Sequence, residues 1–225
     1  DSYYCGVAYG HYDIDWLISS MSVAEKDDRL IVAISENGVR AFEDLLLARY
    51  HMIDQVYFHK TKVGFNYYLE QAIIKGEIKL KIPTNPYAYT DLRDGHVIEL
   101  LFTASKDDAN YWSQHLMKRI PAKRILRLHQ SKPEDSQRLE RLKQICEERG
   151  IRYFTYSSKQ QLSHFGETEK EPIIHVAKKL IGDVEYVPIA QYSDLIQKYN
   201  EKIEFTDFFV YKEDTQKYQD YVKGI

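Results

Sequence analysis

The sequence predicts a mainly α-helical fold that ends in an α+β lobe. Apolar residues recur at three- and four-residue steps over 39–50, which is the spacing of one face of an amphipathic helix. After Pro121, short β-like runs alternate with charged helical segments, a pattern typical of a mixed lobe. We therefore expect two domains, a helical one over 1–120 and an α+β lobe over 121–225.

Local signals place the elements of the helical part. Asp13 is expected to cap a short helix, because a carboxylate at this position accepts a hydrogen bond from the first helical turn. The short runs 20–24 and 30–34 flank a charged turn and predict a β-hairpin. Further helices are expected over 39–50, from 53 to near Gly76, after Thr90 with Val97, Leu100, Leu101 and Phe102 as its buried stripe, and over 106–119.

The carboxyl-terminal lobe has weaker signals. The alternating charges of 133–149 predict an exposed helix with pairs four residues apart. The polar stretch 157–172 is expected to be a mobile loop. Strands are expected over 124–129, 152–156, 173–176, 184–187 and 208–211.

Composition excludes several classes of protein. No apolar run approaches the roughly 20 residues of a membrane span, and neither end resembles a signal segment, so we expect a cytoplasmic protein without membrane contact. Cys5 and Cys146 make no disulfide framework. The net charge of -3 argues against a nucleic-acid-coating surface. The chain starts at Asp1 inside structured sequence, which indicates a fragment or a processed product.

Compact catalytic motifs are absent from the sequence, which holds no GxxxxGK loop and no HExxH. The segment 49–60 is more informative, because Arg49, Ile53 and Tyr57 fall on one helical stripe. Arg49 and Tyr57 would lie roughly 12 Å apart along the axis, about the reach from a terminal phosphate to a sugar. Alternatively, Arg49 pairs with Asp54 and Tyr57 belongs to the core, and spacing alone favours this structural interpretation.

Two other groups of side chains have structural and functional interpretations. Tyr3, Tyr4 and Tyr9 are expected to pack rather than to recognise a ligand. A basic patch is expected to be a solvated face, with phosphate contact as the alternative. The patch consists of Lys118, Arg119, Lys123, Arg124 and Arg127.

Three segments together resemble a known family. They are DSYYCG at 1–6, the run 49–60, and YTDLRD at 89–94 followed by an apolar helix. In this order they resemble the part that follows the HD motif in deoxynucleoside-triphosphate (dNTP) triphosphohydrolases, both bacterial members and the mammalian SAM- and HD-domain enzyme. The resemblance is specific over about 1–105. It implies that 1–120 are the last helices of an HD-type catalytic domain.

The resemblance implies substrate-binding roles for three residues. Asp1 matches the aspartate that binds the sugar 3′-hydroxyl, Arg49 matches the arginine on the triphosphate, and Tyr57 matches the tyrosine against the deoxyribose. A tyrosine at that point leaves no room for a 2′-hydroxyl. The implied activity is hydrolysis of a dNTP to a deoxynucleoside and triphosphate.

The resemblance also implies regulation and assembly. His59 and Lys60 match a pair near an activating-nucleotide site at subunit contacts, and Lys123 and Lys212 match basic residues there. The implied assembly is a homo-oligomer, either a dimer or a tetramer. Cations of the mammalian activator pocket are replaced here, which puts activation of that kind in doubt. The replacing residues are Trp16, Ser35 and Asn37.

The family's divalent-metal ligands, including a His-Asp dyad, precede the position of Asp1, and this sequence contains no His-Asp dipeptide. The resemblance therefore implies a metal held by an amino-terminal HD-bearing portion, with no metal ligand and no catalytic residue in this chain. We expect the chain alone to be inactive. The alternatives are a nucleotide-responsive oligomerisation module without catalysis, and an HD phosphohydrolase acting on another nucleotide.

Overall fold

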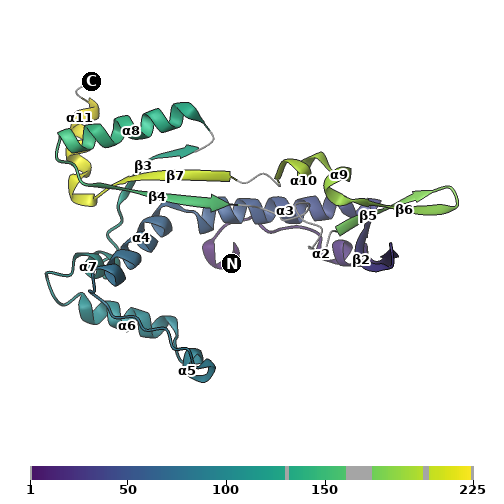
Figure 1. Cartoon of the computed structure of the whole chain (residues 1–225), viewed down its shortest axis with the longest axis horizontal. Helices are drawn as coiled ribbons and strands as arrows, with labels where there is room; N and C mark the ends of the chain where they lie inside the picture. The colour runs from purple at the N-terminus through teal and green to yellow at the C-terminus, as the bar shows by residue number, and fades with distance from the viewer. Residues whose placement is uncertain (1, 130–131, 161–173, 200–202, 224–225) are drawn as a thin grey trace. The chain divides into compact units, whose positions relative to one another are not determined.

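The computed structural model describes residues 2–129, 132–160, 174–199 and 203–223. The chain forms two compact units, and each unit is built from two stretches of sequence (Figure 1). The first unit consists of 1–58 and 159–203, and the second of 59–158 and 204–225. None of the helices in the described ranges combines the length and apolar character that a membrane span requires.

The first unit is built around a four-stranded sheet in the order β1-β2-β5-β6. The β1–β2 and β5–β6 pairs are antiparallel hairpins, whereas β2 and β5 pair in parallel, with Ala33 opposite His175. Its elements are α1 (Ser2–Cys5), α2 (Ile14–Ser19), β1 (Met21–Lys26), β2 (Arg29–Ser35), η1 (Glu36–Gly38), α3 (Val39–Met52), η2 (Ile53–Tyr57), β5 (Ile174–Leu180), β6 (Asp183–Pro188), α9 (Ile189–Tyr192) and α10 (Asp194–Tyr199).

Short-range chemistry explains the start of this unit. The Asp13 side chain accepts a hydrogen bond of 2.9 Å from the backbone N–H of Trp16, which caps α2 as expected. Asp27 and Asp28 turn the hairpin with φ of 52° and 59°. Two consecutive positive φ values match the twist of a hairpin, and aspartate tolerates this conformation better than most residues.

The core of the first unit joins both of its sequence stretches. Ile34 and Phe42 from the first stretch pack in one apolar cluster with Val176, Ile189 and Ile196 from the second. A buried polar contact reinforces the junction, because the Ser193 hydroxyl donates a 2.6 Å hydrogen bond to the Glu43 carboxylate. The first stretch therefore cannot bury its apolar face without the second.

The second unit combines helices with a three-stranded sheet in the order β3-β7-β4. Val97, Leu100 and Leu101 on one face of α6 pack in an apolar cluster with residues of α4 and α7. Its elements are α4 (Lys60–Ile74), α5 (Pro86–Thr90), α6 (Asp94–Ala104), α7 (Tyr111–Met117), β3 (Lys123–His129), α8 (Pro133–Glu148), β4 (Tyr153–Gln160), β7 (Ile203–Val210), η3 (Lys212–Asp214) and α11 (Thr215–Lys223).

Stacked aromatic rings join a helix of the second unit to its sheet. Tyr67 on α4 stacks on Phe154 of β4 with ring centroids 3.8 Å apart, and Phe154 stacks in turn on Phe209 of β7. Tyr68 is fully buried beside this stack. Flat side chains bury large areas at a low cost in rotamer entropy, so they join helix and sheet efficiently.

The predicted fold class is matched only in part: the chain is mixed α+β with two sheets, and one of these sheets lies in the unit that contains most of the region expected to be helical. The hairpin, the helix over 39–50 and the later strands are confirmed. The compact units do not follow the boundary at 120/121, so that domain division stays a prediction. Most of the expected loop 157–172 lies outside the described residues, and its start belongs to β4. Phe102 is not part of a buried stripe, since it is 52% exposed.

Candidate functional site

A cavity of about 550 Å³ opens in the first unit, and both Arg49 and Tyr57 line it. The rest of the wall combines Tyr9 and Tyr12 from the loop before α2 with apolar side chains of α3, among them Met52. The two residues that the sequence singled out therefore share one cavity.

A π-helical turn lies between the two residues. α3 ends at Met52, and the N–H of Phe58 donates a 2.8 Å hydrogen bond to the carbonyl of Ile53, five residues earlier. Eight residues of regular α-helix would carry Tyr57 about 80° around the axis from Arg49. A π turn is wider and rotates less per residue, which brings the two side chains closer to one line. The sequence did not predict this turn, and such turns are frequent at functional sites.

The loop that lines one side of the cavity is held by glycine and by ring stacking. Gly10 has a φ of +100°, a conformation that side-chain-bearing residues rarely adopt. Tyr9 stacks on His51 of α3, with centroids 5.2 Å apart and an interplanar angle of 27°. The stack attaches the loop to α3, and Tyr9 and Arg49 line the same cavity.

The exposed position of both side chains argues against the structural alternative. Tyr57 is 37% exposed and is not a core residue. Arg49 is exposed as well, and the Asp54 carboxylate accepts a 2.6 Å hydrogen bond from the Gln55 side chain. A guanidinium beside three tyrosines and an apolar floor suits an anionic ligand that also has a flat or apolar part. The assignment of that ligand stays a prediction.

Tyr3 and Tyr4 do not pack as expected. They are 87% and 91% exposed and contact each other edge to face at 5.3 Å. Tyr9 is the member of this group that reaches the cavity. Asp1, the expected ligand of the 3′-hydroxyl, lies outside the described residues.

The expected regulatory residues all belong to the second unit. His59 caps α4, with its Nδ1 accepting a 3.3 Å hydrogen bond from the N–H of Thr61, and Lys60 is the first residue of that helix. Lys123 lies opposite Val210 at one end of the β3–β7 ladder, and Lys212 comes two residues after Val210 in the sequence. These two lysines are therefore at the same end of the sheet, and both are exposed. Their role at an activating-nucleotide site stays a prediction.

Metal binding finds no support in the described part of the chain. No group of three or more histidine, cysteine or carboxylate side chains there is arranged to hold an ion. The residues described do not fit a divalent metal, so no catalytic step of this chain is assigned to one.

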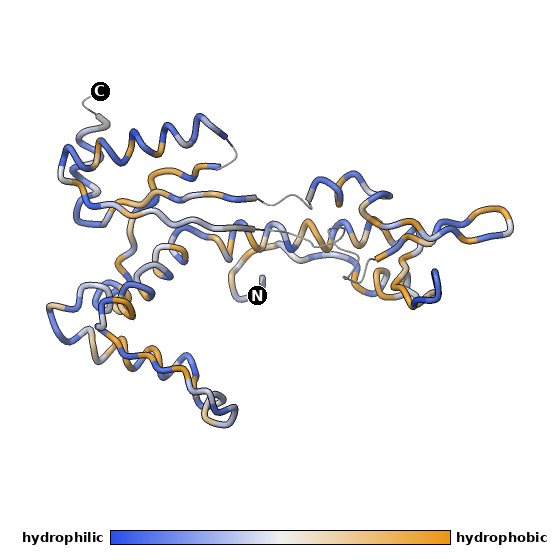
Figure 2. The backbone as a smooth tube through the Cα atoms, in the orientation of Figure 1, coloured by the Kyte–Doolittle hydropathy of each residue, from blue (hydrophilic) through white to orange (hydrophobic). Residues whose placement is uncertain are grey.

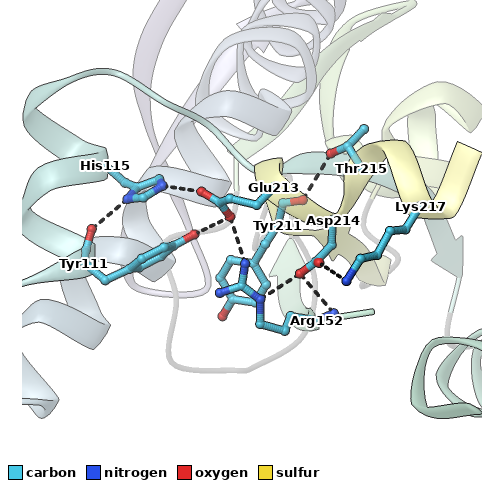
Figure 3. Close-up of polar contacts among 8 residues, drawn as sticks. All are labelled: Tyr111, His115, Arg152, Tyr211, Glu213, Asp214, Thr215 and Lys217. Atoms are coloured by element: carbon cyan, nitrogen blue, oxygen red, sulfur yellow. Dashed lines mark hydrogen bonds and ion pairs between the residues drawn. The ribbon is translucent and has the colours of Figure 1, made fainter. Parts of the chain in front are cut away.

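A second polar cluster, in the second unit, was not foreseen (Figure 3). Glu213 accepts hydrogen bonds from the Tyr111 hydroxyl at 2.9 Å and from Arg152 Nη2 at 3.1 Å, and its Oε1 lies 2.7 Å from His115 Nε2. Arg152 Nε also donates to Asp214 at 2.7 Å. The cluster joins three segments that are distant in sequence, one holding Tyr111 and His115, one holding Arg152, and one holding Glu213 and Asp214.

The electrostatics of this cluster indicate a structural clamp. Burial opposes ionisation of Glu213, but its backbone hydrogen bond and those from His115 and Tyr111 outweigh burial, so its pKa lies below the ordinary value. The pKa of Asp214 is likewise lowered, because hydrogen bonding and charge from Arg152 outweigh burial. Burial, with Tyr68 and Glu213 nearby, raises the pKa of Tyr111. Each carboxylate is thus already stabilised as an ion by its partners, which leaves none poised to transfer protons.

Two arginines of the basic patch form ion pairs with a buried aspartate. Arg127 and Arg124 both contact Asp207, which is fully buried on β7. These two arginines are therefore neither members of a solvated face nor ready phosphate ligands. Lys123 beside them remains exposed.

Comparison with known proteins places the chain beside HD proteins. A family model described as HD associated region matches residues 12–153. An uncharacterized protein, YwfO, of Bacillus subtilis (strain 168) is 42% identical over 59 residues, which are 26% of this chain and 13% of that protein. An uncharacterized protein of Methanocaldococcus jannaschii is 35% identical over 75 residues, which are 33% of this chain and 17% of that protein.

Two solved structures share the fold. A hypothetical protein from Aquifex aeolicus superimposes with a TM-score of 0.69 at 25% identity, covering 96% of this chain and 53% of that one. A phosphohydrolase from Bacteroides thetaiotaomicron superimposes with a TM-score of 0.62 at 23% identity, covering 94% of this chain and 59% of that one. The chain thus spans little more than half the length of these structural relatives, and the matches to the curated relatives cover less than a fifth of theirs.

Proposed function

The chain belongs to the family described as HD associated region, and from this membership we propose that it supplies substrate-binding elements to an HD-superfamily phosphohydrolase. The phosphohydrolase from Bacteroides thetaiotaomicron, which shares the fold, supports the reaction class. The observation that carries the proposal is the cavity that Arg49 and Tyr57 line together.

The proposed substrate is a dNTP, and the proposed products are a deoxynucleoside and inorganic triphosphate. Water adds to the α-phosphorus, the bond from phosphorus to the sugar 5′-oxygen breaks, and that oxygen takes up a proton. The ligands of the divalent metal associated with this chemistry are assigned to a portion of the protein other than the described residues.

The chain's own contribution is recognition. Arg49 binds the triphosphate, because a guanidinium fork matches phosphate oxygens in geometry and charge. Tyr57 lies against the deoxyribose, where a second hydroxyl would clash with the ring. Asp1 accepts a hydrogen bond from the 3′-hydroxyl, a role that rests on the family resemblance alone.

Binding calorimetry on the full chain in the presence of a chelator tests these roles without depending on hydrolysis. Arg49→Ala should weaken binding of both dATP and inorganic triphosphate by about 10- to 100-fold, since a hydrogen bond to a charged group contributes about 1.5–3 kcal/mol. Tyr57→Ala should weaken binding of dATP but not of inorganic triphosphate. It should also reduce the preference of the chain for dATP over ATP. Arg40→Ala is the matched control, because Arg40 lies on the same helix, pairs with Glu43 and does not line the cavity.

Each outcome separates the alternatives. Unchanged dATP binding in Arg49→Ala would remove the proposed triphosphate site. Equal affinity of the unaltered chain for ATP and dATP would favour a phosphohydrolase acting on another nucleotide. A dNTP-dependent change in sedimentation that Arg49→Ala and Tyr57→Ala both leave intact would favour a nucleotide-responsive oligomerisation module without catalysis.

A further inference from the structure

The outer face of α6 carries an unpartnered apolar stripe flanked by opposite charges. One face of α6 packs in the core of the second unit through Val97, Leu100 and Leu101. On another face Ile98 and Phe102 are 54% and 52% exposed, although both are large apolar side chains. Figure 2 shows how apolar residues recur along this helix.

The stripe continues at the same four-residue step in both directions. Asp94 lies four residues before Ile98 in the first turn of α6. Lys106 lies four residues after Phe102, and its Nζ lies over the Phe102 ring at 4.8 Å from the centroid. Asp94, Ile98 and Phe102 therefore form one ridge on α6, acidic at its start, and Lys106 in the turn after the helix makes the other end basic.

This ridge is complementary to itself. A two-fold axis placed midway between Ile98 and Phe102 sets Ile98 against the partner's Phe102 and Asp94 against the partner's Lys106. Ridges of four-residue spacing also pack against each other in the commonest class of helix contact. Within the described ranges neither Asp94 nor Lys106 forms an ion pair, so both charges remain for such a contact.

We propose that α6 is an isologous interface through which a second copy of this chain docks antiparallel. The charges select the orientation, because a parallel copy would set Asp94 against Asp94 and Lys106 against Lys106. Tyr87 and Tyr89 on α5, which precedes α6 (Figure 1), are also exposed, at 86% and 57%. A homodimer of this kind repeats each contact twice, as closed two-fold symmetry requires.

Sedimentation velocity of the full chain without nucleotide tests the interface over a series of protein concentrations. The unaltered chain should form a reversible dimer. Phe102→Glu and Ile98→Glu should each raise the dimer dissociation constant by about 30-fold or more, the scale of a buried apolar hot spot. Leu30→Glu is the matched control, because Leu30 is 79% exposed on the β1–β2 hairpin and should leave the dimer intact. Circular dichroism verifies that each variant folds.

A charge exchange tests the orientation. Asp94→Lys alone and Lys106→Asp alone should weaken the dimer, and the double exchange should restore it. Asp94→Lys also places a cation at a helix amino terminus, which destabilises the helix. The double variant carries the same unfavourable charge, so recovery of the dimer there cannot come from the helix terminus. A chain that stays monomeric at every concentration, a Phe102→Glu variant that dimerises normally, or a double exchange no better than the single variants would each overturn the proposal.

Discussion

Arg127 holds the buried Asp207 through two parallel hydrogen bonds, with Nε 2.8 Å from Oδ1 and Nη2 3.0 Å from Oδ2. The pair joins β3 to β7, and the Arg127 guanidinium also lies over the Phe205 ring at 4.3 Å. A bidentate pair fixes direction as well as distance, which suits a contact that sets the register of two strands.

Removal of the Asp207 carboxylate should lower the free energy of unfolding by more than its ion pair with Arg127 contributes. Asp207→Ala removes the buried carboxylate that both part-buried guanidinium groups contact, so the free energy of unfolding should fall by about 3–5 kcal/mol. Urea denaturation measures this change. Glu140→Ala removes a surface pair with Lys143 and should cost about 1 kcal/mol or less. Equal effects of the two substitutions would contradict a structural role for the Asp207 pair.

Gly38 is required by close packing rather than by backbone conformation. A Cβ at this position would lie 2.3 Å from the Cβ of Ser20 and 2.9 Å from Cγ2 of Ile34. Gly38→Ala should therefore lower the free energy of unfolding by about 1–3 kcal/mol through overpacking. Gly95→Ala is the control, because a Cβ there meets open space on α6 and should be neutral or stabilising by up to about 1 kcal/mol. A harmless Gly38→Ala would show that the start of α3 can shift.

The polar cluster of Glu213 and Asp214 with Arg152, Tyr111 and His115 should make the stability of the chain sensitive to acid. The pKa values of Glu213 and Asp214 are lowered in the folded chain from ordinary values of 4.5 and 3.8. Their contribution is therefore complete above those ordinary values and is lost as the pH falls through the lowered ones. Urea unfolding as a function of pH should show this loss. The variant Glu213→Gln/Asp214→Asn should be less stable at neutral pH and should have a shallower acid slope; an unchanged slope would contradict the assignment.

The two thiols should differ in reactivity. Burial, with a smaller effect of Glu147, raises the pKa of Cys146 to about 11, and this side chain is fully buried. Cys5 is exposed. A thiol-specific reagent should label Cys5 in the folded chain and Cys146 only after denaturation, since the thiolate is the reactive form. Fast labelling of a Cys5→Ser variant would show that the Cys146 region opens readily.

The elements that form from local signals were predictable. Asp13 capped its helix as expected, and the hairpin turned at Asp27 and Asp28. The parallel pairing of β2 with β5 was not predictable, because it joins Val32 to Ile174 across a long stretch of sequence without any local signal. Periodicity also could not decide which apolar stripe of α6 faces the core, and Phe102 was assigned to the wrong one.

The candidate site was predictable only in part. The spacing of Arg49 and Tyr57 indicated a shared face, and the structure places both on one cavity. The π turn between them is defined by backbone hydrogen bonds, which no residue type specifies. The loop that adds Tyr9 and Tyr12 depends on the left-handed conformation of Gly10, which a sequence permits but does not require.

Each of the two units is completed only by residues late in the sequence, and this order has a consequence for synthesis on the ribosome. The β1–β2 hairpin emerges early, but the strand that pairs with the open edge of β2 follows more than a hundred residues later. Until β5 appears, β2 presents unpaired N–H and carbonyl groups and a row of apolar side chains to solvent or to a neighbouring nascent chain. A pause in translation within the second unit would therefore prolong the interval in which strands of different chains can join, and a chaperone that shields this edge would act at that interval.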